Sequence, residues 1–171
     1  MMDIGELVED FELPGLDGRA YRLADYRGWI VVITFWSASC PWSKLYDAYF
    51  QGRWQDWQRQ GIILLAIASN ADESEADLRR AAAEAGLSFP ILLDRGNAIA
   101  DRFQAVTTPH VFVIDAAGRL AYRGAVDNRQ FRREATVNYL DEALTSLRAG
   151  RRPQVQETPP RGCTIVRALE A

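Results

Sequence analysis

Residues 29–41 read WIVVITFWSASCP and decide the fold of this 171-residue chain. Residues 29–36 are almost continuously apolar and rich in β-branched side chains, which is typical of a strand buried on both faces of a parallel sheet. Pro41 then stands where the first turn of a helix begins, a position that needs no N–H donor. The stretch therefore predicts a buried strand, a short loop and a helix, with Cys40 at the junction.

The position of Cys40 has a chemical consequence. Peptide N–H groups and the positive end of the helix dipole stabilise negative charge at the start of a helix. A thiol there ionises more easily, and the thiolate is both the nucleophile and the leaving group in disulfide exchange. Trp36 and Trp42 flank the cysteine and can shield one side of its sulfur. We therefore expect Cys40 to be a reactive centre, the alternative being a buried and inert cysteine.

Strand and helix patterns continue through the rest of the chain. The expected elements are short strands at 11–13 and 20–22, the strand 29–36, a helix from Pro41 that stops at Gly61, a strand at 62–68, a helix over 74–86, a short helix around 99–103, a hairpin of 111–114 with 120–123, and a last helix that carries Phe131, Val137, Leu140, Leu144 and Leu147. Strands that alternate with helices before an antiparallel pair predict an α/β fold, a mixed central sheet with helices on both faces. We expect residues 1–150 to form the domain and residues 151–171 to form a C-terminal tail packed on it.

Several of these segments resemble the thioredoxin-like superfamily. Residues 35–43 (FWSASCPWS) are similar to its strand-to-helix motif, and residues 106–109 (VTTP) resemble its Thr-Pro loop, in which the proline is cis and faces the cysteine. Residues 11–28 resemble the N-terminal strand extension of the redoxin branch, also called the alkyl hydroperoxide reductase/thiol-specific antioxidant group. Residues 122–127 and 162–165 resemble a bacterial subgroup with one active-site cysteine. The resemblance implies antioxidant-type redox activity at Cys40, with Thr108 and Pro109 presenting backbone to an extended substrate.

The sequence departs from the patterns of these relatives in two places. Ser43 stands where thioredoxins have their second cysteine, so no local disulfide can form, although a serine there can donate a hydrogen bond to a Cys40 thiolate and lower its pKa. Peroxiredoxins share a Pro-x-x-x-Thr/Ser-x-x-Cys motif and an arginine. Ser37 fits the hydroxyl position, but Ile33 and Pro109 stand where the proline and the arginine are expected. Half of the peroxide-activating residues are therefore missing.

Cys163 and His110 each have two interpretations. Cys163 is either a resolving cysteine that attacks a mixed disulfide or sulfenic acid at Cys40, or an inert residue at a sheet edge. The chain after Gly150 is long enough to reach the active site, at about 3.3 Å per extended residue. His110 either contacts a substrate or Cys40, or is a strand histidine with a satisfied hydrogen bond. Arg123 and Asp127 are expected to form a local ion pair.

Composition excludes several classes of function. The net charge of −3 gives no electrostatic reason to expect nucleic acid or a membrane surface as a partner. The first residues lack the pattern of a secretory signal and the apolar runs are too short to span a bilayer, so we expect a cytoplasmic protein. A single histidine and two cysteines leave no basis for a metal site, and we expect no cofactor. No pattern indicates the oligomeric state.

The sequence therefore predicts a thiol-dependent oxidoreductase in which Cys40 attacks disulfide or oxidised sulfur substrates. Cys163, a partner protein or a low-molecular-weight thiol such as glutathione then completes the cycle. One alternative is a thiol peroxidase of the peroxiredoxin type, with Cys40 oxidised to sulfenic acid. The other is a thioredoxin-like interaction module without enzymatic activity.

Overall fold

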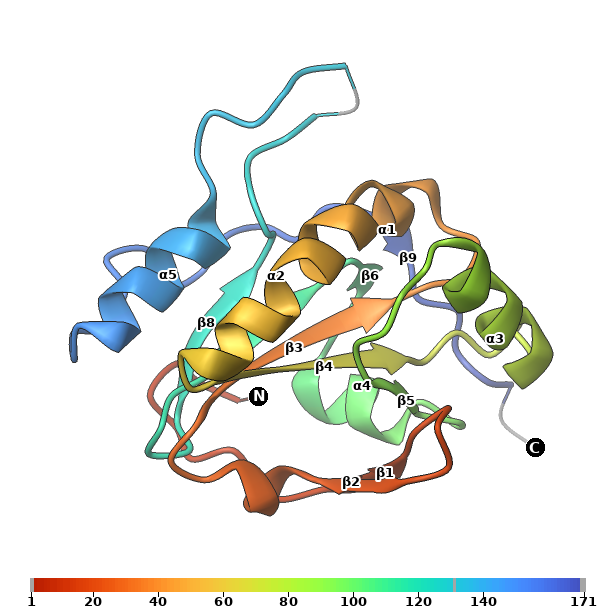
Figure 1. Cartoon of the computed structure of the whole chain (residues 1–171), viewed down its shortest axis with the longest axis horizontal. Coiled ribbons are helices and arrows are strands. Elements are labelled where there is room, and N and C mark those ends of the chain that lie inside the picture. The colour runs from red at the N-terminus through yellow and green to blue at the C-terminus, as the bar shows by residue number, and fades with distance from the viewer. Residues whose placement is uncertain (1, 131, 170–171) are drawn as a thin grey trace.

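A five-stranded mixed sheet forms the centre of the molecule (Figure 1). The computed structural model describes residues 2–130 and 132–169. The strand order is β5-β4-β3-β7-β8, in which β3, β4, β5 and β8 run in one direction and β7 runs antiparallel to its neighbours β3 and β8. The strands are β3 (Ile30–Trp36), β4 (Ile62–Ala68), β5 (Ile91–Leu93), β7 (Val111–Ile114) and β8 (Leu120–Gly124). The predicted α/β class with a mixed sheet is confirmed.

The central strand β3 is buried along its whole length, as its apolar pattern predicts. Alternate side chains of a strand point to opposite faces of the sheet. Val32 and Trp36 join a core cluster with helices α2 (Asp47–Arg59) and α5 (Tyr139–Arg148) on one face. Ile33 and Phe35 join a second cluster on the other face, with α4 (Ala98–Phe103) and the hairpin of β1 (Glu12–Pro14) and β2 (Ala20–Arg22). Figure 1 shows these two layers above and below the sheet.

The remaining helices differ from the expected ones at their ends. The single helix expected from Pro41 is divided at Tyr46 into α1 (Pro41–Leu45) and α2, and a 3-10 turn at Leu23–Tyr26 follows β2. Helix α3 (Glu75–Glu84) starts with a reciprocal capping box of Ser74 and Asp77, close to the start expected for the helix over 74–86.

The last helix begins later than expected, at Tyr139. Its start is set by the Asn138 side chain, which accepts a hydrogen bond from the Asp141 N–H. The preceding segment is held instead as a loop, because the Asn128 side chain bonds the backbone of Thr136 and Val137. Val137 therefore lies before the helix, and Phe131 lies outside the described residues.

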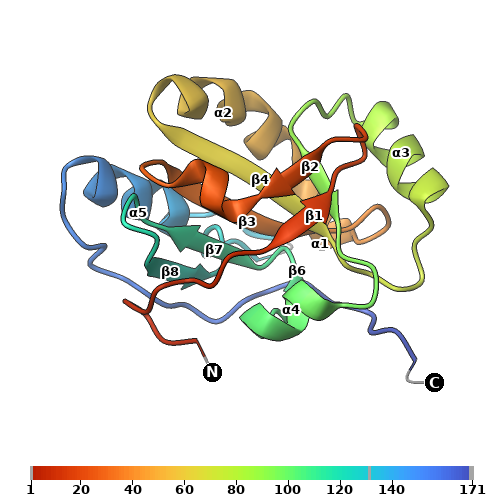
Figure 2. The ribbon, with the colours of Figure 1, turned by 90° about the horizontal axis from the view of Figure 1, so that it is seen from below.

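The segment after α5 runs back along the domain and past α4 (Figure 2). Gln156 and Thr158 exchange backbone hydrogen bonds with Arg123 in β8. The Thr158 hydroxyl lies 2.7 Å from the Tyr122 hydroxyl and accepts a hydrogen bond from the Ala125 N–H at 3.0 Å. Near its end Ile165 is only 3% exposed in the second core cluster. No helix in the described residues is both long and apolar enough to cross a bilayer.

We expect Thr158→Val to lower the free energy of unfolding by about 1–3 kcal/mol, because the buried Tyr122 hydroxyl and Ala125 N–H lose a partner. Urea denaturation measures the change. The control is Thr145→Val on the exposed side of α5, where the effect should stay within about 0.5 kcal/mol. Equal losses in the two variants would contradict a specific role of Thr158.

Candidate active site

Cys40 lies where β3 ends and α1 begins. It is the N-cap residue of α1 and only 4% exposed. The Ser43 N–H points at the Cys40 Sγ at 3.4 Å, and the Thr108 carbonyl oxygen lies 3.3 Å from the same sulfur. The sulfur is therefore buried between a helix start, which stabilises negative charge, and a backbone carbonyl, which does not.

Cys163 is bonded to Cys40 in a disulfide that spans 123 positions of the sequence. The two Cα atoms are 6.1 Å apart, inside the range that disulfides require. The structure therefore agrees with the interpretation in which Cys163 reaches Cys40, rather than with an unpaired cysteine at a sheet edge.

The tail approaches the site as a short strand, β9 (Cys163–Thr164), which pairs antiparallel with β6 (Thr107–Thr108). Gly162 makes this approach possible. A Cβ atom at that position would lie 2.0 Å from the Thr108 carbonyl oxygen, so any side chain there would push the tail away from β6.

The Thr-Pro loop has the geometry that the resemblance implied. The Thr108–Pro109 peptide bond is cis, so that prediction is confirmed. The Thr107 hydroxyl donates to the Pro109 carbonyl at 2.8 Å and closes the loop on itself. The Thr108 hydroxyl is buried and has no hydrogen-bond partner among residues 2–130 and 132–169. The backbone expected to pair with an extended substrate pairs with the chain's own tail.

Ser43 contacts Cys40 through its backbone rather than its hydroxyl. The hydroxyl oxygen accepts a hydrogen bond from the Ser37 N–H at 3.1 Å. In this disulfide state the donor to the Cys40 sulfur is the Ser43 N–H, which any residue except proline would supply.

Glu73 holds the loop that carries Cys40, a role that the sequence analysis missed. Its carboxylate is 4% exposed and accepts four hydrogen bonds from that loop, which come from the Ser37 hydroxyl, the Ala38 N–H, and the N–H and hydroxyl of Ser39. One sequence signal points to it. Glu73 follows the strand at 62–68, and parallel strands bring the residues after their carboxyl ends to one edge of a sheet.

Ser37 fills the hydroxyl position of the peroxiredoxin motif, but its proton is already used. The hydroxyl donates to the Glu73 carboxylate at 2.6 Å and accepts from the N–H groups of Ser39 and Cys40. A hydroxyl bound in this way shapes the loop and has no proton left for a peroxide.

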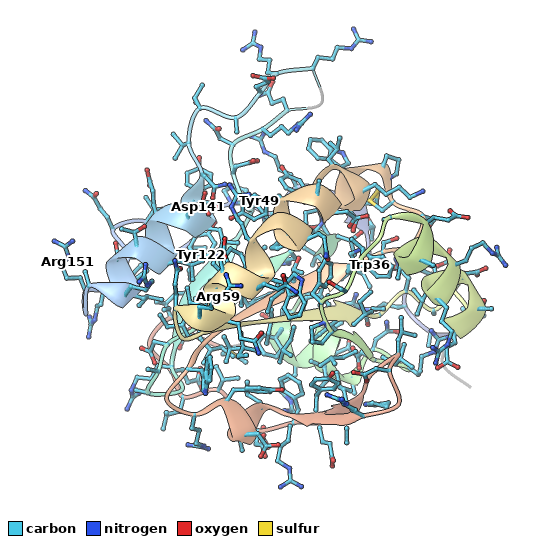
Figure 3. All side chains as sticks on the ribbon, in the orientation of Figure 1. Trp36, Tyr49, Arg59, Tyr122, Asp141 and Arg151 are labelled. Atoms are coloured by element: carbon cyan, nitrogen blue, oxygen red, sulfur yellow. A yellow bond between two sulfur atoms is a disulfide. The ribbon has the colours of Figure 1, made fainter. Side chains whose placement is uncertain are left out.

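Trp36 is directed toward the helices on one face of the sheet. Its Nε1 donates to Asp47 at 2.9 Å, and it lies between α2 and α3, as Figure 3 shows. Burial raises the pKa of the Asp47 carboxyl, and the hydrogen bond from Trp36 opposes that rise. Trp36 thus fixes the start of α2. Trp42 lies in α1 and packs against the same core cluster.

His110 has the satisfied environment of a core histidine. Its Nδ1 accepts a hydrogen bond from the Val106 N–H at 3.2 Å, and its ring lies against Phe112 with centroids 4.5 Å apart. Burial, with a smaller contribution from the charge of Arg123, lowers the pKa of His110 to about 4. The imidazole is therefore neutral at physiological pH.

The expected Arg123–Asp127 ion pair is wrong. Arg123 pairs with Glu157 of the tail at 2.8 Å, because the tail runs beside β8. Asp127 instead accepts hydrogen bonds from the Tyr46 hydroxyl at 2.7 Å and the Arg129 N–H at 3.0 Å. Burial and this bond raise the pKa of Tyr46, so the hydroxyl stays protonated and ties the α1–α2 junction to the loop after β8.

A cysteine at a strand–helix junction, faced by a cis-proline loop on a mixed sheet, defines the class of thioredoxin-like proteins. The thioredoxin domain of a thiol-disulfide oxidoreductase from Bacteroides vulgatus has this fold, with a TM-score of 0.64 over 72% of this chain and 89% of that chain at 20% identity. Residues 4–123 match the model of the AhpC/TSA family, and the chain belongs to that family.

Two further relatives are similar to the chain. Thiol-disulfide oxidoreductase ResA from Geobacillus thermodenitrificans is 32% identical over 117 residues, which are 68% of this chain and 66% of that protein. The match thus spans just under two thirds of the length of this relative. The crystal structure of an uncharacterized conserved protein from Geobacillus kaustophilus superposes with a TM-score of 0.91 at 27% identity. That similarity covers 100% of this chain and 95% of that chain, so it includes the tail with Cys163.

We expect the single histidine to titrate with a midpoint near 4 in the folded protein, against its ordinary value of 6.5. Since the unfolded chain then binds the proton more readily, the free energy of unfolding is undiminished above pH 6.5. It falls by up to about 3 kcal/mol as the pH drops toward 4. NMR of the imidazole measures the midpoint, and His110→Gln should remove this part of the pH dependence. A midpoint near 6.5 would contradict the burial argument.

We expect Glu73→Gln to destabilise the protein by about 1–3 kcal/mol, because an amide cannot accept all four hydrogen bonds. In the reduced protein the loss of a nearby negative charge should lower the pKa of Cys40. The pH dependence of Cys40 alkylation in a Cys163→Ser background measures this. Glu75→Gln, an exposed acid two residues further on, is the control and should change neither quantity appreciably.

Proposed function

We propose that Cys40 and Cys163 are the redox pair of a thiol–disulfide oxidoreductase. The disulfide between them is the observation that carries the proposal, since a thiol bonded to its resolving partner is the oxidised state of such an enzyme. Membership of the AhpC/TSA family and the similarity to ResA support it.

The reaction proceeds by two exchange steps. The Cys40 thiolate attacks one sulfur of a substrate disulfide, forms a mixed disulfide and releases the first substrate thiolate. The Cys163 thiolate then attacks the Cys40 Sγ, which releases the second substrate thiolate and leaves the Cys40–Cys163 disulfide. The Ser43 N–H and the start of α1 stabilise the Cys40 thiolate before attack.

The position of Cys163 favours this internal resolution. The tail is anchored on both sides of the cysteine, by Thr158 before it and by Ile165 after it. Holding two reacting groups together raises their effective concentration far above that of an external thiol. We therefore propose that Cys163, rather than an external thiol, resolves the mixed disulfide.

Peroxidase activity is the weaker candidate. The Ser37 hydroxyl donates its proton to Glu73. Pro109, which follows the cis peptide bond, stands where the peroxiredoxin pattern has an arginine. The negative charge of Glu73 beside the loop also opposes the anion that peroxide reduction generates. A pure interaction module would not need a second cysteine paired with the first.

The proposal predicts that the oxidised protein contains one intramolecular Cys40–Cys163 bond and turns over a disulfide substrate when a reductant is supplied. Cys40→Ser should abolish exchange. Cys163→Ser should accumulate a mixed disulfide on Cys40 and turn over more than about tenfold more slowly. Mass spectrometry under non-reducing conditions and a thiol-release assay give both readouts.

Ser43→Ala is the matched control, because it keeps the backbone N–H that contacts Cys40. Wild-type turnover by Cys163→Ser would rule out internal resolution. Rapid hydrogen peroxide consumption by the wild type, without disulfide exchange, would favour the peroxidase instead.

A further inference from the structure

We propose that the thiol which reduces the Cys40–Cys163 disulfide is a small anionic thiol, held beside Cys163 by Arg129 and Arg161. This inference rests on the proposed redox pair and adds the chemical class of its reductant. Three features of the site carry it: an occupied backbone edge, unequal exposure of the two sulfurs, and two arginines without carboxylate partners.

The backbone edge next to Cys40 is occupied by the tail. Extended peptides commonly bind by adding a strand to such an edge. Here Thr107 and Thr108 already pair with Thr164 and Cys163, and Gly162 packs directly on the Thr108 carbonyl. While β9 is in place, a reductant cannot pair with this edge and must be recognised by side chains.

The two sulfurs differ in accessibility. Cys40 is 4% exposed, whereas Cys163 is partly exposed at the surface of the tail. An external thiolate therefore attacks the Cys163 Sγ. The S–S bond breaks, its electron pair goes to the Cys40 Sγ, and the Ser43 N–H lies beside the sulfur that receives the charge.

A second thiolate then completes the reduction. It attacks the reductant sulfur of the mixed disulfide, releases the Cys163 thiolate and forms the small-molecule disulfide. In total, two thiols are oxidised to one disulfide, and the enzyme disulfide becomes two cysteines that take up the two protons lost by the thiols.

Arg161 lies in the segment that leads to Cys163 and links this segment to Arg129. Arg161 precedes Cys163 by two positions, and its Nη1 donates to the Arg129 carbonyl at 3.3 Å. Within the described residues neither guanidinium has a carboxylate within 4.0 Å, and the Arg129 Nε is buried without a partner. Guanidinium groups match carboxylates in geometry and charge.

The other charges around this arginine pair do not cancel it. Asp127 contributes one negative charge, and its Oδ1 already accepts the Tyr46 hydroxyl and the Arg129 N–H. Both guanidinium groups lower the pKa of Tyr46 against the effect of burial, and the backbone N–H of Arg129 shares the Asp127 carboxylate with the Tyr46 hydroxyl. Glu73 lies buried under the Cys40 loop, where four donors share its charge.

The test compares three small thiols of similar size: mercaptopropionate, mercaptoethanol and cysteamine, which are anionic, neutral and cationic. For each thiol, we measure the rate constant with which its thiolate form reduces the oxidised wild-type protein. Dividing this value by the rate constant of the same thiolate with a simple small disulfide removes differences in intrinsic reactivity. We expect mercaptopropionate to be favoured over mercaptoethanol by about fivefold at low salt and cysteamine to be disfavoured, with the preference shrinking as salt rises.

The double variant Arg129→Gln with Arg161→Gln should lose this preference, because the mercaptopropionate dianion should be slowed more than the mercaptoethanol thiolate, which carries one negative charge fewer. The matched control is Arg151→Gln with Arg152→Gln, which removes the same charge just beyond α5, where Figure 3 shows Arg151 on the opposite side of the molecule from Trp36. It should keep the preference. The salt and charge dependence of the wild type also tests the proposal if the double variant does not fold.

Two results would overturn the inference alone: normal reduction by mercaptoethanol with no charge preference in the wild type, or equal loss of preference in the two double variants. Failure of every thiol to reduce the protein, or absence of the disulfide, would instead overturn the proposed redox pair and the inference with it.

Discussion

The parallel ladder between β3 and β4 determines where every part of the redox site lies. Its register pairs Ile30 with Ile62 and Trp36 with Ala68, so the two strands end at the same edge of the sheet. The loop with Cys40 leaves one strand there and the segment with Glu73 leaves the other. Because β7 runs antiparallel to β3, Pro109 arrives at this edge from the opposite direction. Three segments distant in sequence therefore meet without long connections.

The sequence predicted the parts of this arrangement that depend on local pattern. Unbroken apolar runs marked β3 and β4, and the motif around Cys40 marked the strand–helix junction. Strands β5, β6 and β9 were missed because two or three residues carry no detectable period, and no neighbouring hairpin pattern marks them as it marks the equally short β1 and β2. The helix division at Tyr46 depends on the tertiary bond between its hydroxyl and Asp127. The role of Glu73 and the choice between the two interpretations of Cys163 were beyond local reasoning, since both depend on contacts between distant segments.

The tail takes part in the site through its backbone as well as its sulfur. Ser43 removes the local second cysteine, and a strand from the far end of the chain supplies the replacement with its own pairing to β6. In the proposed mechanism, one segment therefore supplies both the resolving cysteine and the strand that pairs with β6. This arrangement gives the two sulfurs different environments. The Cys40 sulfur is buried at the start of α1, whereas Cys163 is partly exposed to solvent.

The 123-residue span of the disulfide has a consequence for the whole molecule. The covalent ring that it closes contains β4, β5, β7, β8 and all the α-helices. In chain-entropy terms, closing a ring of that size restricts the unfolded chain by about 5 kcal/mol. In the proposed reaction cycle this ring opens and closes, so we expect resistance to unfolding and to proteolysis to rise and fall with the oxidised fraction of the protein. Under that proposal, the thiol supply that drives turnover also governs how long the protein survives.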